Sequence, residues 1–121
     1  LSEIDRHSEL LRMKPQFQDS LKPSDGLFVV LFISDFTMLQ VAFEIYEKKK
    51  IKLKVISSLH HTIWIHDANP DPLGWYLVVL ECHVISFGRG RLEANIFDES
   101  RKCVMTVIQE GYFQRTQENK L

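Results

Sequence analysis

The sequence predicts a single α+β domain in which one long apolar helix is followed by four or five antiparallel strands. Three observations support this: an apolar stretch over residues 27–47, period-two strand patterns after it, and a hairpin-type turn at residues 98–101. A chain of 121 residues is long enough for one domain with its own hydrophobic core and too short for two.

Composition narrows the classes of partner. The chain is 45% hydrophobic and 26% charged, which is typical of a globular protein. Its 15 basic and 16 acidic residues give a net charge of −1, so electrostatics give no reason to expect binding to nucleic acid or to an anionic membrane surface. The longest fully apolar run, residues 27–33, is well short of the roughly 18 residues that a membrane span needs. We therefore expect neither nucleic acid nor membrane as a partner.

The domain is predicted to occupy residues 24–115. Residues 1–23 are polar and are interrupted by Pro15 and Pro23, so we expect an irregular N-terminal segment. Residues 116–121 are polar and are expected to form a mobile C-terminal tail.

The long helix is predicted over residues 27–47. Ser24, Asp25 and Gly26 precede it, as helix-start residues do. The pattern is apolar nearly all round for two turns, which is typical of a central, buried helix. Strong β-formers at residues 27–33 leave a strand followed by a helix as an alternative, but the length of the stretch favours a helix.

The rest of the chain reads as strands and turns. Residues 51–55 alternate strictly between apolar and polar, and a second short strand is predicted over residues 62–66. After a turn at residues 67–72, longer strands are expected over 75–86, 91–97 and 102–109, with the last two joined by the hairpin turn. A helix followed by such a sheet suits a hotdog fold, in which a curled antiparallel sheet wraps one helix.

Asp35 is the most informative polar residue. It follows the apolar run inside a helix that should be buried, and burying a carboxylate without a hydrogen-bond partner is costly. A carboxylate that faces a cavity in such a place is a candidate general base. The alternative is structural: Asp35 bonds the backbone of a neighbouring strand or caps a helix that begins there.

Other polar residues carry weaker signals. Ser58 and Gln109 stand at predicted strand ends, where neutral side chains are more often surface or turn residues. His60 and His61 are adjacent, so on a strand they point to opposite faces and cannot hold one ion together. The residues around His66 and His83 do not form a zinc-site motif of Cys, Asp and His, and we therefore expect no metal site.

The segment Asp67-Ala68-Asn69-Pro70 resembles the start of the motif of hotdog enoyl-CoA hydratases. In that motif an Asp and a His act on water as an acid–base pair, and the His follows shortly after the Pro. Here Asp71 and Pro72 stand in that place, so a turn is the better interpretation.

From Ile33 onward the chain resembles the C-terminal half of acyl-CoA thioesterase II and its peroxisomal eukaryotic counterparts, which are double-hotdog enzymes. The Ser-Leu-x-His-x-x-Trp-x-His run and the Gln-Glu-Gly near the end are specific when they occur together. The matching stretches are ISDFTMLQVA at 33–42, SSLHHTIWIH at 57–66, WYLVVLEC at 75–82, GRGRLEANIFD at 88–98 and VIQEGYF at 107–113.

The resemblance implies a thioesterase that hydrolyses fatty acyl-CoA to a free fatty acid and CoA without a metal or redox cofactor. It places the catalytic residues at Asp35, Ser58 and Gln109, which together hold the attacking water. This chain departs from the family at His60, where the family usually has Asp, and in its shorter N-terminal segment. A non-catalytic hotdog module that binds acyl-CoA, or that only supports a partner subunit, is the alternative.

The resemblance also implies a partner and a location. Family sites lie between paired hotdog units, so we expect a homodimer or pairing with a second hotdog domain. The chain ends Asn119-Lys120-Leu121, which differs from the peroxisomal address Ser-Lys-Leu only at its first position. We therefore expect a peroxisomal location, with the cytosol as the alternative.

Overall fold

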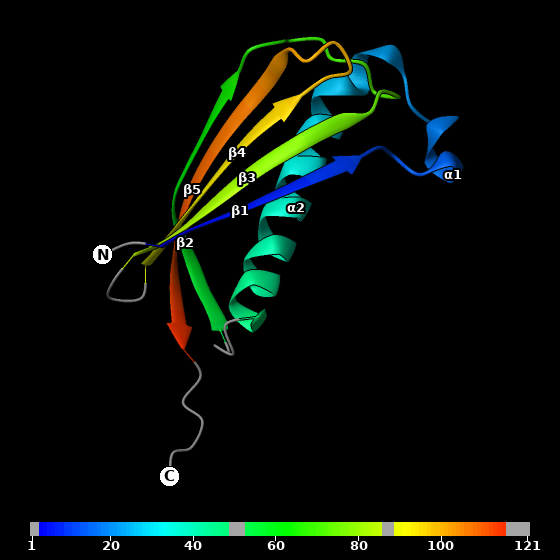
Figure 1. Ribbon diagram of the computed structural model, residues 1–121. Helices are drawn as coiled ribbons and strands as arrows, with labels where there is room; N and C mark the ends of the chain where they lie inside the picture. The colour runs from blue at the N-terminus through cyan, green and yellow to red at the C-terminus, as the bar shows by residue number, and fades with distance from the viewer. Residues whose placement is uncertain (1–2, 49–52, 86–88, 116–121) are drawn as a thin grey trace.

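A five-stranded antiparallel sheet lies against one long helix in the computed structural model, which describes residues 3–48, 53–85 and 89–115 (Figure 1). The tail at 116–121, with its predicted mobility and peroxisomal address, lies outside these residues. The elements in chain order are β1 (Glu3–Leu11), α1 (Pro15–Gln18), a 3₁₀ turn (Pro23–Asp25), α2 (Gly26–Lys48), β2 (Leu53–Ile65), β3 (Tyr76–Ile85), β4 (Arg89–Phe97) and β5 (Cys103–Arg115).

The strands lie in the order β1-β3-β4-β5-β2, and each neighbouring pair is antiparallel. The strands β1 and β2 therefore form the two edges of the sheet. Figure 1 shows the strands twisting strongly, with α2 lying along one side of them. One helix packed on an antiparallel sheet confirms the predicted α+β class.

The core lies between α2 and the middle of the sheet. Every second residue is buried among the described side chains of β3 and β4, which is the period expected when one face of a sheet packs on a helix. The buried apolar side chains are Val29, Val30, Ile33 and Met38 from α2, and Tyr76, Val78, Leu80, Cys82, Leu92, Ala94, Ile96, Val104, Met105 and Val107 from the strands and the β4–β5 hairpin.

The helix α2 is found where the sequence predicts it, but the expectation that it is a central, buried helix holds for only part of its surface. The side chains of Phe28, Phe32 and Phe36 are 73%, 61% and 58% exposed. They recur every four residues and so form one stripe, in which the rings of Phe32 and Phe36 stack with centroids 6.2 Å apart. Among the described elements, the helix packs against β4, β3, the 3₁₀ turn and β1, and the exposure of the three Phe side chains shows that the stripe lies away from these contacts. Within the described part of the chain, no helix has the length and hydropathy needed to cross a membrane.

The predicted irregular segment at residues 1–23 contains a nine-residue strand instead, β1. It pairs with β3 from Glu3, opposite Val84, to Leu11, opposite Tyr76. Its charged residues hide the strand signal in the sequence, yet charges are common on edge strands because they discourage pairing with other chains. Backbone pairing with β3 thus outweighs the weak local preference.

The two short strands predicted at residues 51–55 and 62–66 form one strand, β2, over the part that the structure describes. It pairs with β5 from Leu53 to Ile65, with register shifts between Val55 and Ser57 and between Ser58 and His60. The residues between the two predicted strands have weak strand preference, but a full-length partner strand holds them in the sheet.

Candidate functional site

The predicted site residues Ser58 and Gln109 lie on neighbouring strands, β2 and β5. Ser58 lies opposite Gly111 and His61 lies opposite Gln109. Because Gly111 and Gln109 are two residues apart in β5, positions 58 and 61 of β2 occupy the same face of the sheet. Ser58 and Gln109 thus belong to one face, on paired strands.

A β-bulge makes this arrangement possible. Ser58 lies opposite Gly111 and His60 opposite Glu110, so β2 advances two residues where β5 advances one. In a regular strand, residues three apart point to opposite faces, and the extra residue Leu59 brings positions 58 and 61 back to the same one. Bulges are over-represented next to active sites, where they redirect side chains.

The face that carries Gln109 is the face that packs on α2. Gln109 alternates with Val107 and Met105, both of which are fully buried in the core, and its own side chain is half-buried. Gln109 is thus less covered than Val107 before it and Gly111 after it on the same face. Sequence reasoning placed Gln109 near the end of the last strand, whereas β5 continues to Arg115.

Asp35 lies on the exposed stripe of α2. It comes seven residues after Phe28 and three after Phe32, and its side chain is exposed. The inference that Asp35 is buried was therefore wrong, because it assumed that every side of an apolar helix packs on the sheet. The buried polar residues nearby on α2 are Ser34 and Thr37 instead, and the hydroxyl of Ser34 donates to the carbonyl of Leu31 at 2.8 Å.

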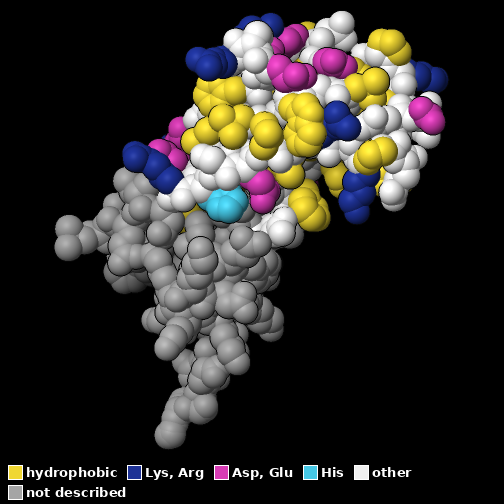
Figure 2. Space-filling model, turned by 45° about the vertical axis from the view of Figure 1, so that its right-hand side comes forward, with side chains coloured by type: hydrophobic (Ala, Val, Ile, Leu, Met, Phe, Trp, Pro, Cys, Tyr) yellow, Lys and Arg dark blue, Asp and Glu magenta, His cyan; other side chains and the backbone are white. Residues whose placement is uncertain are grey.

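Asp35 is an exposed carboxylate that lies among exposed aromatic side chains of α2. A space-filling view turned toward the α2 side shows hydrophobic side chains gathered among charged ones (Figure 2). A second surface over the stripe would exclude solvent water from this carboxylate.

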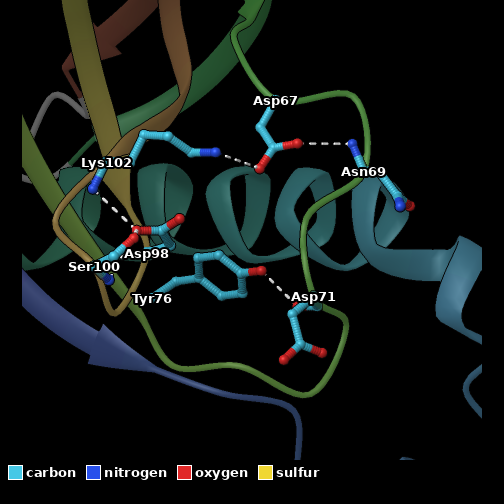
Figure 3. Close-up of polar contacts among 7 residues, drawn as sticks. All are labelled: Asp67, Asn69, Asp71, Tyr76, Asp98, Ser100 and Lys102. Atoms are coloured by element: carbon cyan, nitrogen blue, oxygen red, sulfur yellow. Dashed lines mark hydrogen bonds and ion pairs between the residues drawn. The ribbon is translucent and has the colours of Figure 1, made fainter.

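A separate polar cluster joins the loop after β2 to the β4–β5 hairpin (Figure 3). The carboxylate of Asp67 accepts from the backbone N–H of Asn69 at 2.9 Å and pairs with Lys102 Nζ at 3.1 Å. Asp98 Oδ1 accepts from the backbone N–H groups of Ser100 and Lys102, at 3.0 and 2.9 Å, and from the Ser100 hydroxyl at 2.8 Å. The turns predicted at residues 67–72 and 98–101 are both confirmed.

These contacts hold the two carboxylates in their charged form. The backbone N–H of Asn69, followed by the Lys102 ammonium group, lowers the pKa of Asp67. The backbone N–H of Lys102, followed by the Ser100 hydroxyl, lowers the pKa of Asp98. Burial, reinforced by the nearby carboxylates, raises the pKa of Tyr76 to about 12, and its hydroxyl donates to the carbonyl of Asp71 at 2.5 Å.

The cluster therefore closes a turn and offers no acid–base pair. A carboxylate with a lowered pKa is a poor proton acceptor, which agrees with the sequence argument against a hydratase motif at Asp67. Among the residues that the structure describes, no group of three or more His, Cys, Asp or Glu side chains is placed to hold a metal ion.

Comparisons with known proteins place these features in a family. A family model for the acyl-CoA thioesterase C-terminal domain matches residues 8–113. Among solved structures, acyl-CoA thioesterase II TesB2 from Mycobacterium marinum gives a TM-score of 0.66 at 18% identity, covering 94% of this chain and 43% of that one. The chain thus spans less than half the length of the mycobacterial enzyme.

Two shorter proteins are matched along most of their length. A hot-dog-like protein from Thermanaerovibrio acidaminovorans gives a TM-score of 0.63 at 15% identity, covering 93% of this chain and 82% of that one. The protein smu.793 from Streptococcus mutans UA159, bound to acetyl CoA, gives 0.61 at 6% identity, covering 93% and 84%. No curated protein matches the chain in sequence.

The solved structures confirm the predicted hotdog fold. At sequence identities this low, structural similarity supports the fold and not a specific activity. The family model covers nearly the whole described sheet and helix, including Asp35, Ser58 and Gln109. The resemblance inferred from the sequence motifs is therefore confirmed: this chain belongs to the acyl-CoA thioesterase C-terminal domain family.

Proposed function

We propose that this chain is a catalytic unit that hydrolyses fatty acyl-CoA to a free fatty acid and CoA. The observation that carries the proposal is the bulged register of β2 on β5, which sets position 58 on the same face as Gln109. A bulge that sets two predicted site positions on one face supports a functional site better than either position does alone.

In the proposed reaction Asp35 accepts a proton from a bound water as the water oxygen attacks the thioester carbonyl carbon. Within one chain Asp35 lies on the side of α2 away from the sheet face of Gln109, so we propose that Ser58 and Gln109 of a paired copy orient that water. The geometry of attack is then set before the reaction begins. The carbon–sulfur bond of the tetrahedral intermediate then breaks, and the proton held by Asp35 passes to the departing sulfur. A thioester carbonyl is already reactive, so one base with two orienting groups is adequate, and we propose no metal or redox cofactor.

The family and the aromatic stripe of α2 support a fatty acyl-CoA as the substrate class. Phe28, Phe32 and Phe36 expose apolar surface beside Asp35, which suits an acyl chain better than a polar acid. The S. mutans protein with the same fold is bound to acetyl CoA, which supports a CoA thioester as the ligand class.

The working unit is proposed to contain two hotdog domains. An exposed stripe of three aromatic residues is typical of a surface that another protein surface covers. The mycobacterial enzyme, of which this chain covers 43%, is long enough for a second such unit. We propose that a second copy of this chain or a second hotdog domain covers the stripe and excludes water from Asp35.

The test is a hydrolysis assay on acyl-CoA substrates of increasing chain length, with release of the CoA thiol as the readout. Asp35→Asn keeps the shape of the side chain but removes the proton acceptor, so the rate is expected to fall about 10²–10⁴-fold. Asp25→Asn serves as a matched control, because Asp25 stands outside the stripe, where it accepts from the backbone N–H of Lys22.

Two results would count against the proposal. An Asp35→Asn variant that hydrolyses acyl-CoA at the original rate would show that another group is the base. A paired, folded chain that binds acyl-CoA but releases no thiol would favour the non-catalytic binding module instead.

A further inference from the structure

His61 lies directly opposite Gln109 on the neighbouring strand, on the same face of the sheet. We propose that His61 is a further catalytic residue, whose imidazole N–H donates a hydrogen bond to the thioester carbonyl oxygen as negative charge develops there. This inference rests on the proposed hydrolysis of acyl-CoA and adds a charge-stabilising group to it.

The strand pairing sets how close the side chains of His61 and Gln109 lie. Residues directly opposite each other in an antiparallel pair have Cβ atoms about 4.5–5.5 Å apart and share a face. The side chains of His61 and Gln109 are therefore neighbours, so a group held by Gln109 lies within reach of the imidazole. The same register sets position 58, opposite Gly111, on this face as well.

The side chains of β2 on this face are partly exposed. Further along the same face, Ile63 and Ile65 lie opposite Val107 and Met105. The two β5 residues are fully buried, whereas Ile63 is 37% exposed and Ile65 is 49% exposed. The cover over the face therefore ends between β5 and β2, and the side chain of His61 is exposed at that boundary.

The adjacent histidine makes the contrast clear. His60 lies opposite Glu110, on the other face of the strand, and its Nε2 is 2.7 Å from the hydroxyl of Thr62. Two histidines that are neighbours in the sequence thus stand on opposite sides of one edge strand. Of these two histidines, His61 is the one that shares a face with Gln109.

The addition of water to the thioester carbonyl suits an N–H donor such as the imidazole of His61. When water adds to the carbonyl carbon, the π electrons of the C=O bond move to the oxygen, and an N–H directed at that oxygen stabilises the charge. When the carbon–sulfur bond breaks, the electrons return to form the carboxylic acid, and the sulfur takes the proton carried by Asp35. The imidazole keeps its own proton throughout, so the step balances without any further reactant.

Substitutions that separate the N–H donor from the rest of the side chain test this role. His61→Leu removes the donor and is expected to lower kcat about 10²–10³-fold with KM changed by no more than a few-fold, as found for the loss of an oxyanion donor. His61→Asn and His61→Gln each keep an N–H group and should recover part of the rate. His60→Leu is the matched control and should leave kcat near that of the unchanged chain.

The outcomes separate this inference from the proposed function. Loss of kcat in His61→Leu, recovery in the amide variants and unchanged thermal unfolding midpoints would support it. A His61→Leu chain with normal kcat, or equal losses in His60→Leu and His61→Leu, would overturn it while Asp35 keeps its role. An unchanged chain with no activity on any acyl-CoA would overturn both proposals.

Discussion

The two sides of α2 are almost equally apolar, yet one is buried and the other is exposed to solvent. One side buries Val29, Val30, Ile33 and Met38 against the sheet. The other exposes Phe28, Phe32 and Phe36 together with Asp35. The buried side has small and medium aliphatic side chains that fit between strands, whereas the exposed side has large rings and a carboxylate.

The apolar side chains of α2 therefore serve two purposes. Those against the sheet stabilise the unit itself, because burial of apolar area is the main driving force of folding. Those in the stripe contribute little to that, since they remain in water within this chain. In our proposal they provide the surface for a second hotdog unit and for the acyl chain.

The first prediction separates the two sides by stability. Met38 is 1% exposed, so Met38→Ala should leave a cavity and lower the free energy of unfolding by about 2–5 kcal/mol. Phe36→Ala, on the 58% exposed stripe, should change it by only about 0.5 kcal/mol. Urea unfolding of the dilute chain measures both, and equal losses would contradict the distinction between the two sides.

The sequence predicted the helix, the hairpin turn at residues 98–101 and the α+β class, because each depends on a local pattern. It did not separate the two sides of α2, because a stripe of Phe has the same hydrophobic signal as a core. It also missed β1, whose charged residues read as irregular chain although pairing with β3 holds them in a strand.

The candidate site was predictable only in part. Asp35, Ser58 and Gln109 came from a resemblance to a family, whereas their spacing in the sequence says nothing about a shared location. The common face of positions 58 and 109 depends on a bulge at Leu59, which arises from pairing with β5 and has no sequence signal. For the same reason His61 was weighed only as a metal ligand.

A second prediction concerns the contact that sets the start of α2. A Cβ atom at Gly26 would collide with the backbone carbonyl of Pro70. Gly26→Ala would usually stabilise a helix, but here it should cost about 1–3 kcal/mol because the loop around Pro70 has to move. Thermal unfolding measures the sign, and a stabilised variant would show that the buried side of α2 is not held by this contact.

A third prediction concerns the exposed side. Phe32→Ala should weaken pairing of the chain roughly tenfold, about 1.4 kcal/mol, because it removes a ring from the centre of the stripe. Sedimentation at several concentrations measures the dissociation constant. Phe17→Ala is the matched control, since Phe17 is 48% exposed but lies on α1, and equal weakening by both changes would show that the stripe has no special part in pairing.

The smallest expected effect lies in the polar cluster that holds the loop carrying Pro70, next to the buried side of α2. The pKa of Asp98 is lowered by its hydrogen bonds in the folded chain, so the unfolded chain binds a proton more readily. The stabilisation is therefore fully present above about pH 4 and is lost as the pH falls below that value, through the lower pKa of the folded state. Asp98→Asn should lower the free energy of unfolding at neutral pH by less than about 1 kcal/mol, since the carboxylate is partly exposed and water screens its charge. It should also reduce the difference in unfolding midpoint between pH 7 and pH 3.

Asp67→Asn should act in the same direction, because the pKa of Asp67 is lowered as well. If the acid sensitivity of Asp98→Asn equals that of the unchanged chain, the charge on this turn does not help to hold the loop against α2.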